Sequence, residues 1–210
     1  MAGLAFVGFA VAAHGMPYFP FDPPISRAVQ AVDAPWLHPL AAAASWIGFP
    51  PQVNVLVGLL VLGLWLVRRP WEAAAVALAG AGAGGLYLLV QALVGQPRPT
   101  ADLVRVAANL PSSAFPSGHE TTFTAVLGVF AYLGYTNARR ALARWLSVLA
   151  AVAGLLVMGW ARVFQGEHWA SDILGGCFLG CLWLALTIHL YRWARQRYTP
   201  PCRSPSDSSS

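Results

Sequence analysis

The sequence predicts an all-α fold: a polytopic membrane protein with a six-transmembrane-helix bundle and a short interfacial helix in the first outer loop. Hydrophobic residues make up 57% of the 210 residues, whereas charged residues make up only 10%. A soluble domain usually carries about 25% charged residues, so this chain lacks the polar surface that water requires. Its apolar stretches recur along the chain, and they approach the length of about 20 residues that crosses a bilayer.

The N-terminal part is expected to hold one span and the first outer loop. Residues 1–13 are apolar, and we interpret them as a first span although they are short for one. Residues 14–45 are rich in Pro and Trp and are expected to form a loop. Within this loop, Asp22 followed by Pro23 is typical of a helix start, with an Asp cap and Pro in the first turn. Apolar residues then recur at helical spacing, which favours an amphipathic helix lying in the membrane interface.

The rest of the chain is expected to complete a single membrane-embedded domain over residues 1–198. Five further spans are predicted at residues 46–67, 71–94, 119–135, 145–161 and 170–191. The segment at residues 199–210 is polar and rich in Ser and Pro, which predicts a disordered tail.

The arginines predict the orientation of the bundle. All 13 basic residues are Arg, and in a membrane protein they report topology through the positive-inside rule. One side carries Arg68, Arg69, Arg139, Arg140, Arg144, Arg192, Arg195 and Arg197. That side is predicted to be cytoplasmic, with both termini, in the inner (plasma) membrane of a bacterium. Because no basic stripe with interleaved aromatics stands out, the net charge of +5 is not interpreted as nucleic-acid binding.

Three separate stretches deliver polar residues to the opposite, outer side. These residues are Gln91, Arg98, Ser117, Gly118, His119, Arg162, His168 and Asp172. Ionisable groups near a bilayer are costly and usually functional. A purely structural interpretation is also open. Ser117 would then be a helix N-cap with His119 beside it by chance, and His168 would be a histidine at the membrane interface near the helix-start residue Asp172. That interpretation does not explain why two arginines lie on the same side.

The residue types indicate phosphate chemistry. Ser117 and Gly118 stand where a helix begins, and free N–H groups at a helix start bind anions. His168 and Asp172 are four residues apart, so a carboxylate can fix the imidazole tautomer and leave the other nitrogen free as a nucleophile. Guanidinium groups such as those of Arg98 and Arg162 match phosphate oxygens in a bidentate way. No clustered set of metal ligands is present in the sequence, so neither a metal nor another cofactor is expected.

These motifs resemble those of the type 2 phosphatidic acid phosphatase superfamily. The family pattern is Lys-x6-Arg-Pro, Pro-Ser-Gly-His and Ser-Arg-x5-His-x3-Asp, and the resemblance covers roughly residues 20–195. Gln91 stands in place of the first Lys, and Ala161 replaces the Ser before the second Arg. Gln91 can still donate a neutral hydrogen bond to a phosphate.

The resemblance implies a metal-free phosphatase. By resemblance, His168 attacks phosphorus and forms a phosphohistidine, Asp172 orients it, and His119 protonates the leaving oxygen and then activates water. The phosphoryl oxygens are then held by Arg98, Arg162, Ser117, the Gly118 amide and Gln91. The expected substrate is a lipid phosphate or a polyprenyl pyrophosphate such as undecaprenyl pyrophosphate, cleaved at the outer membrane face. Two alternatives stay open: a phosphotransferase on the same scaffold, and a catalytically weakened member that binds phosphorylated lipid.

Overall fold

The computed structural model describes residues 1–198, which form eight α-helices and no strand. The helices are α1 (Ala2–His14), α2 (Asp22–Ala31), α3 (Leu37–Gly48), α4 (Gln52–Leu66), α5 (Pro70–Val94), α6 (Gly118–Asn137), α7 (Ala141–Phe164) and α8 (Ala170–Tyr198). The predicted all-α class is therefore confirmed for these residues. The tail predicted at residues 199–210 lies outside the described residues.

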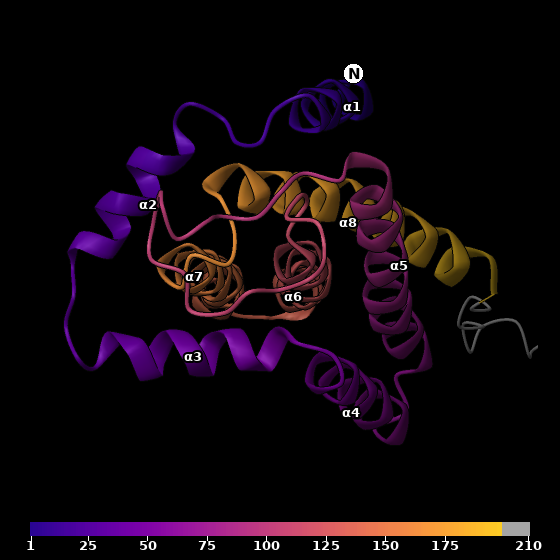
Figure 1. Ribbon diagram of the computed structural model, residues 1–210. Coiled ribbons are helices and arrows are strands. Elements are labelled where there is room, and N and C mark those ends of the chain that lie inside the picture. The colour runs from indigo at the N-terminus through magenta and orange to yellow at the C-terminus, as the bar shows by residue number, and fades with distance from the viewer. Residues whose placement is uncertain (199–210) are drawn as a thin grey trace, which may run out of the picture.

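Helix α6 lies at the centre of the molecule. It contacts α3, α5, α7 and α8, and Figure 1 shows α6 and α7 almost end-on, with the other helices around them. Its buried face carries Ala125, Val126 and Val129, which pack on the small residues Ala79 and Ala83 of α5. Because α6 is enclosed by other helices, it can carry polar residues at its first turns, where the site described below is built.

Only some of the predicted spans meet the length and hydropathy that a bilayer demands. Helices α5, α7 and α8 do so, and α3 with α4 would make a fourth span that is bent by 63°. The bend lies at Pro50 and Pro51, and Pro interrupts a helix because it lacks an N–H and clashes with the preceding turn. Helix α1 has 13 residues and is shorter than a span. The membrane character is thus confirmed, whereas the count of six spans stays a prediction.

The predicted loop at residues 14–45 is wrong in its second half, which forms most of α3. Leu37, Ala41 and Ser45 are buried at intervals of four residues, which is the spacing of one helix face. Leu37 and Ala41 pack against Ala161 and Phe164 of α7. This apolar helical face was present in the sequence, but the density of Pro and Trp around it concealed the signal.

The helix predicted at Asp22 is present as α2, but the role expected for Asp22 is different. The N-cap of α2 is Phe21, and no side chain caps it. The Asp22 carboxylate is fully buried and accepts hydrogen bonds from other segments instead. Whether α2 lies in a membrane interface stays a prediction.

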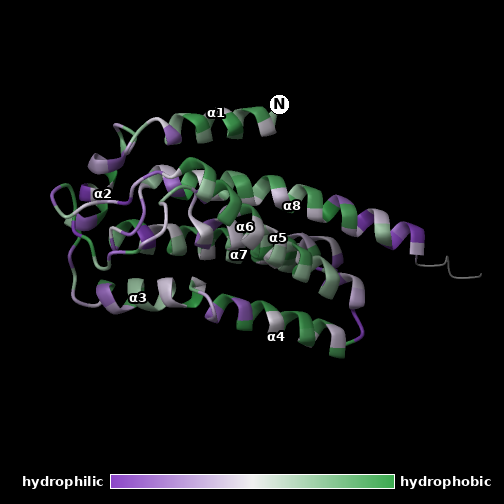
Figure 2. Cartoon of the chain, turned by 45° about the vertical axis from the view of Figure 1, so that its right-hand side comes forward, coloured by the Kyte–Doolittle hydropathy of each residue, from purple (hydrophilic) through white to green (hydrophobic). Residues whose placement is uncertain are grey.

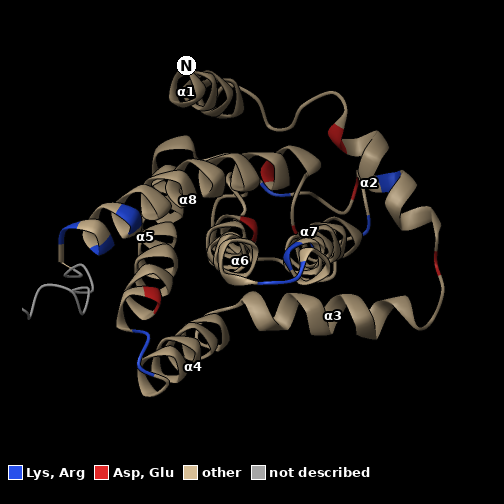
Figure 3. Ribbon diagram, turned by 180° about the vertical axis from the view of Figure 1, so that it is seen from behind, with Lys and Arg blue, Asp and Glu red and all other residues tan. Residues whose placement is uncertain are grey.

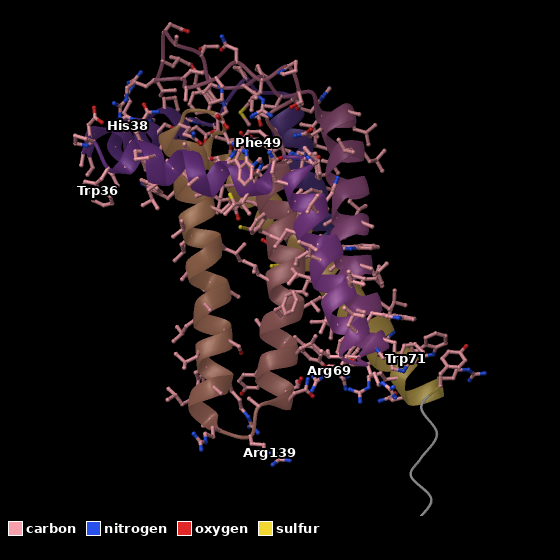
Figure 4. All side chains as sticks on the ribbon, turned by 90° about the horizontal axis from the view of Figure 1, so that it is seen from below. Trp36, His38, Phe49, Arg69, Trp71 and Arg139 are labelled. Carbon is pink, nitrogen blue, oxygen red and sulfur yellow. The ribbon has the colours of Figure 1, made fainter. Side chains whose placement is uncertain are left out.

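The outer surface of the bundle is apolar, and charge is confined to its ends. Figure 2 shows green, hydrophobic residues along the outward faces of the helices. Basic residues gather at the α4–α5 connection and at the end of α8 (Figure 3). Figure 4 shows Arg69, Trp71 and Arg139 at one end of the bundle, with His38 and Phe49 at the other. Arg69 and Arg139, two of the arginines predicted to be cytoplasmic, therefore lie at the end away from Phe49.

The starts of α6 and α8 are held together closely. A Cβ placed on Gly176 of α8 would lie 2.7 Å from the Ser117 carbonyl oxygen and 2.8 Å from the Glu120 Cβ. No side chain fits into that space, so a glycine is required there. The Ser117 N–H donates to the Asp172 carbonyl oxygen at 3.0 Å. This packing brings the second and third sequence motifs to the same place.

Candidate active site

The eight predicted site residues lie at the ends of four helices and in the connections between them. Gln91 is in the last turn of α5, and Arg98 follows in the α5–α6 connection. Ser117 is the N-cap of α6, and Gly118 and His119 open that helix. Arg162 is in the last turn of α7, His168 is in the α7–α8 connection, and Asp172 is in the first turn of α8. All of them except Arg98 and Gly118 are buried.

His168 is held between one acceptor and one donor, and this arrangement defines its tautomer. An Nη1 nitrogen of Arg98 lies 3.3 Å from His168 Nε2. A guanidinium can only donate, so Nε2 must be the unprotonated nitrogen. The proton is then on Nδ1, which donates to Asp172 Oδ2 at 3.2 Å. The Nε2 lone pair therefore points to a cationic group, as a nucleophile that attacks an anion requires.

The electrostatic surroundings of His168 keep its ring neutral. The side chain is 2% exposed. Burial, together with the positive charges of Arg162 and Arg98, holds the pKa of His168 well below its ordinary value. A neutral imidazole is the form that has a lone pair to give.

Arg98 is fixed by the chain segment that precedes α6. Its Nε donates to the Ser112 carbonyl oxygen at 2.8 Å, and its Nη2 donates to the Ser112 hydroxyl at 2.8 Å and to the Ser113 carbonyl oxygen at 3.3 Å. Its Nη1 also donates to the Glu167 carbonyl oxygen. The guanidinium is thus oriented before any anion arrives, which reduces the entropy that binding costs.

Arg162 is paired with a carboxylate that the motif analysis did not single out. Its guanidinium forms an ion pair with Glu167, and both side chains are buried. The Arg162 guanidinium carbon lies 5.0 Å from the centroid of the Phe49 ring, within the range of a cation–π contact. The Nε of Arg162 has no hydrogen-bond partner among residues 1–198. A buried donor of this kind is costly unless a further acceptor is bound.

The start of α6 combines a helix cap with tight packing. The Ser117 hydroxyl accepts from the Glu120 N–H at 3.4 Å, so Ser117 is the N-cap of α6, as the structural interpretation of this motif predicts. A Cβ on Gly118 would lie 2.7 Å from the Tyr87 ring, so packing already requires a glycine there, independently of any ligand. Gln91 Nε2 donates to the Pro116 carbonyl oxygen at 3.2 Å. Gln91 thus supports the backbone of this motif.

His119 contacts the end of α3. Its Nε2 lies 3.0 Å from the Ser45 carbonyl oxygen, which can only accept, so Nε2 carries the proton. The Phe49 ring packs edge-on against the imidazole, with 4.8 Å between the ring centroids. The break between α3 and α4 therefore covers His119 and Arg162 with one aromatic ring.

Sequence reasoning missed three residues of this site: Ser45, Phe49 and Glu167. Glu167 stands beside His168, and a carboxylate next to a motif histidine was a usable signal. Ser45 and Phe49 belong to the helix end that was assigned to a loop or to the beginning of a span. Among residues 1–198, no cluster of three or more His, Cys, Asp or Glu side chains could hold a metal ion.

Known proteins resemble this chain over most of its length. It is 28% identical over 185 residues to phosphatidylglycerophosphatase B of Bacillus subtilis (strain 168). This alignment covers 85% of this chain and 87% of that protein. The crystal structure of a transmembrane PAP2 type phosphatidylglycerolphosphate phosphatase from Bacillus subtilis is similar in fold, with a TM-score of 0.80, 22% identity, and coverage of 96% and 97% of the two chains. LpxE of Aquifex aeolicus matches with a TM-score of 0.66, 18% identity, and coverage of 83% and 98%.

The family match covers the site itself. Residues 71–196 match the PAP2 superfamily, and all eight predicted site residues lie within that range. The segment also contains α6 and α7 and nearly all of α5 and α8, the helices that position them. The chain belongs to the PAP2 superfamily, as its three sequence motifs predict.

Proposed function

We propose that this protein is an integral membrane phosphatase that hydrolyses a lipid phosphate through a phosphohistidine on His168. The observation that carries the proposal is the arrangement around the imidazole: Nδ1 donates to Asp172, and Nε2 accepts from Arg98. A neutral imidazole with its free nitrogen facing a guanidinium is suited to attack a phosphate that the guanidinium holds.

The reaction we propose has two steps. His168 Nε2 forms a bond to phosphorus while the bond from phosphorus to the lipid oxygen breaks, and the leaving oxygen takes the proton of His119. His119 then accepts a proton from a water molecule, which attacks the phosphohistidine and releases inorganic phosphate. The His119 Nε2–H is bonded to the Ser45 carbonyl oxygen, so the proton that the leaving oxygen takes comes from Nδ1 of the imidazolium form. His119 is then left neutral and can accept the proton of the water molecule.

The same proposal assigns the phosphate contacts. Arg98 and Arg162 neutralise the phosphoryl oxygens, and the Arg162 Nε, which has no partner within residues 1–198, supports this role. Ser117, the Gly118 amide and Gln91 complete the cradle at the start of α6, where the helix dipole favours an anion. These groups supply the charge stabilisation that phosphoryl transfer needs without a metal ion or another cofactor.

The proposed substrate is a phosphorylated glycerolipid, and the proposed location is the outer face of a bacterial inner membrane. The similarity to phosphatidylglycerophosphatase B supports phosphatidylglycerophosphate as the first substrate to test. Phosphatidate and undecaprenyl pyrophosphate are the next candidates. The positive-inside rule supports cytoplasmic termini, an outer site and α2 in the outer interface. We propose that residues 1–198 act as one membrane domain.

The test is phosphate release by the purified protein in mixed micelles. Phosphatidylglycerophosphate, phosphatidate and undecaprenyl pyrophosphate are compared, with His168→Ala as the inactive variant and His189→Ala, on the last third of α8, as the control. We expect His168→Ala to lose at least roughly 10⁴-fold of the activity, as removal of a nucleophile does in other covalent enzymes. Equal release by wild type and His168→Ala would reject the mechanism, and phosphorylated acceptor without free phosphate would indicate the phosphotransferase.

Gln91 favours one alternative, a catalytically weakened member that binds phosphorylated lipid. Its side chain is neutral, and its Nε2 is engaged with the Pro116 carbonyl oxygen. The variant Gln91→Lys keeps a donor at this position and adds a charge to the cradle. If the protein is weakened, this variant releases phosphate faster than wild type. If the site is built around the Gln, the variant is slower.

A further inference from the structure

Asp22 connects the N-terminal part of the chain to the first turn of α8. Its Oδ1 accepts from the Ser171 N–H at 2.8 Å, and its Oδ2 accepts from the Ser171 hydroxyl at 2.7 Å. Oδ2 also accepts from the Phe19 N–H at 2.8 Å. Asp22 and Ser171 are both fully buried, and they are 149 residues apart in the chain. A buried carboxylate is tolerated only when it is bonded in this way.

The first turn of α8 has backbone donors that its own helix cannot satisfy. Trp169 precedes the helix, and an indole cannot accept a hydrogen bond as a Ser or Asp cap does. Two carboxylates from other positions supply the missing acceptors. Asp172 accepts from the Trp169 N–H at 2.7 Å, and Asp22 accepts from the Ser171 N–H. Asp22 is therefore an N-cap supplied by a distant segment.

This cap acts next to the proposed nucleophile. Ser171 directly precedes Asp172, whose Oδ2 receives both the Trp169 N–H and the Nδ1–H of His168. The direction of the Asp172 carboxylate depends on the backbone of this turn, and the tautomer of His168 depends on that carboxylate. Asp22 contacts neither His168 nor the phosphate cradle, so its effect on the reaction has to act through Asp172. Two routes lead there: the backbone of this turn, and the repulsion between the two carboxylates. The Asp22→Asn variant separates them, because it keeps the cap acceptor and removes the charge.

We propose that Asp22 is a positioning residue: by capping α8 through Ser171, it holds Asp172 in the direction that keeps the His168 proton on Nδ1. The consequence for catalysis rests on the proposed function, whereas the consequence for the tautomer does not. The segment that contains Asp22 would then help to position the catalytic groups, although it lies outside the matched range of residues 71–196.

The test compares Asp22→Ala, Asp22→Asn and Asp33→Ala in the full-length protein. Asp22 begins helix α2, and Asp33 is an exposed acid that follows the end of that helix and pairs with Arg105 at 2.7 Å. Removal of Asp33 is therefore the matched control. The ¹⁵N signals of the His168 ring are read in histidine-labelled protein and identified by their loss in His168→Ala. We expect a fixed Nδ1–H form in wild type, Asp22→Asn and Asp33→Ala, because Asn keeps a cap acceptor. We expect averaged tautomers in Asp22→Ala.

Turnover supplies the second measurement. We expect kcat of Asp22→Ala to fall roughly 10- to 100-fold with little change in KM, as misplacement of reacting groups does. We expect Asp22→Asn to recover most of that loss. In an Asp172→Asn background the Asp22→Ala change should cost almost nothing further, because Asp22 acts through Asp172.

Three results would overturn the proposal: an unchanged His168 tautomer in Asp22→Ala, a loss of kcat that only follows the folded fraction, or full additivity with Asp172→Asn. If Asp22→Ala does not fold, Ser171→Ala replaces it, because this variant removes one of the two donors that Ser171 presents to Asp22. A partial shift of the tautomer then supports the proposal, and no shift rejects it. If wild type releases no phosphate, the proposed function fails, and the ¹⁵N signals still decide the role of Asp22.

Discussion

At the residue scale, the decisive contact is that between His168 and Arg98. The guanidinium marks Nε2 as the unprotonated nitrogen. Burial, with the positive charges of Arg162 and Arg98, holds the pKa of His168 well below its ordinary value. The same charge that holds a phosphate therefore keeps its attacker neutral. A site with one cation fewer would bind the anion less well and would also lose nucleophile to protonation at mildly acidic pH.

This double role predicts a shift in the pH dependence of the reaction. The pKa of free His168 lies well below its ordinary value, so the acid limb of kcat/KM that belongs to this residue should lie below about pH 6.5. In Arg98→Gln one positive charge is removed, so the pKa of His168 rises and the acid limb should move to higher pH. The measurement is the pH profile of the residual kcat/KM in both proteins.

A control separates this effect from ionisation of the substrate. Arg27→Gln changes an exposed arginine of α2, whose Nε donates to the Leu103 carbonyl oxygen. Its acid limb should coincide with that of wild type, since the substrate is the same. An acid limb that does not move in Arg98→Gln would mean that His168 is not the group that titrates.

The sequence was informative about the residues of this site but not about all of their partners. His119, His168 and Asp172 could be predicted because helix ends concentrate them on one side and their spacing is diagnostic. Spacing cannot predict contacts between distant segments, such as Asp22 with Ser171 or His119 with the Ser45 carbonyl oxygen. Gln91 is a similar case, because its bond to the Pro116 carbonyl oxygen depends on how α5 packs beside α6.

At the element scale, the end of α3 is the least expected part of the site. Helix α3 was predicted as loop over most of its length, because Pro and Trp residues outweighed its apolar face. It ends where Pro50 and Pro51 interrupt the helix, and this end places Ser45 and Phe49 against His119. A straight span over residues 46–67 would not have brought a carbonyl oxygen or an aromatic ring to that position.

This packing predicts that Gly48→Ala loses most of the activity. A Cβ at Gly48 would lie 2.1 Å from His119 Cδ2 and 2.8 Å from Nε2. The imidazole must then move by about an ångström, and misplacement of this size costs roughly 100-fold in rate. The control is Gly63→Ala in α4, where an added Cβ meets nothing within 4 Å. That variant should keep wild-type kcat. Equal activity of both variants would show that the end of α3 does not hold His119.

At the scale of the whole molecule, the candidate active site lies at one end of the bundle and basic residues lie at the other. The site residues lie near Phe49, and Arg69 and Arg139 lie at the opposite end (Figure 4). The apolar helices between the two ends carry exposed large side chains such as Leu59, Leu149 and Leu156. Lipid tails can cover such a surface, and water cannot do so without cost. The phosphate group of a lipid substrate and the site of the protein would then lie at the same boundary between lipid and water.

The separation of the two ends predicts a one-sided labelling pattern. In a variant without native cysteines, Ala101→Cys marks the exposed connection that also contains Arg98, and Asn137→Cys marks the exposed end of α6. In intact bacteria a membrane-impermeant maleimide should label Ala101→Cys alone, because the positive-inside rule predicts that the basic end is cytoplasmic. Both variants should be labelled after permeabilisation. The reverse pattern would place the site on the cytoplasmic face, and would require that substrate reaches it from the inner leaflet.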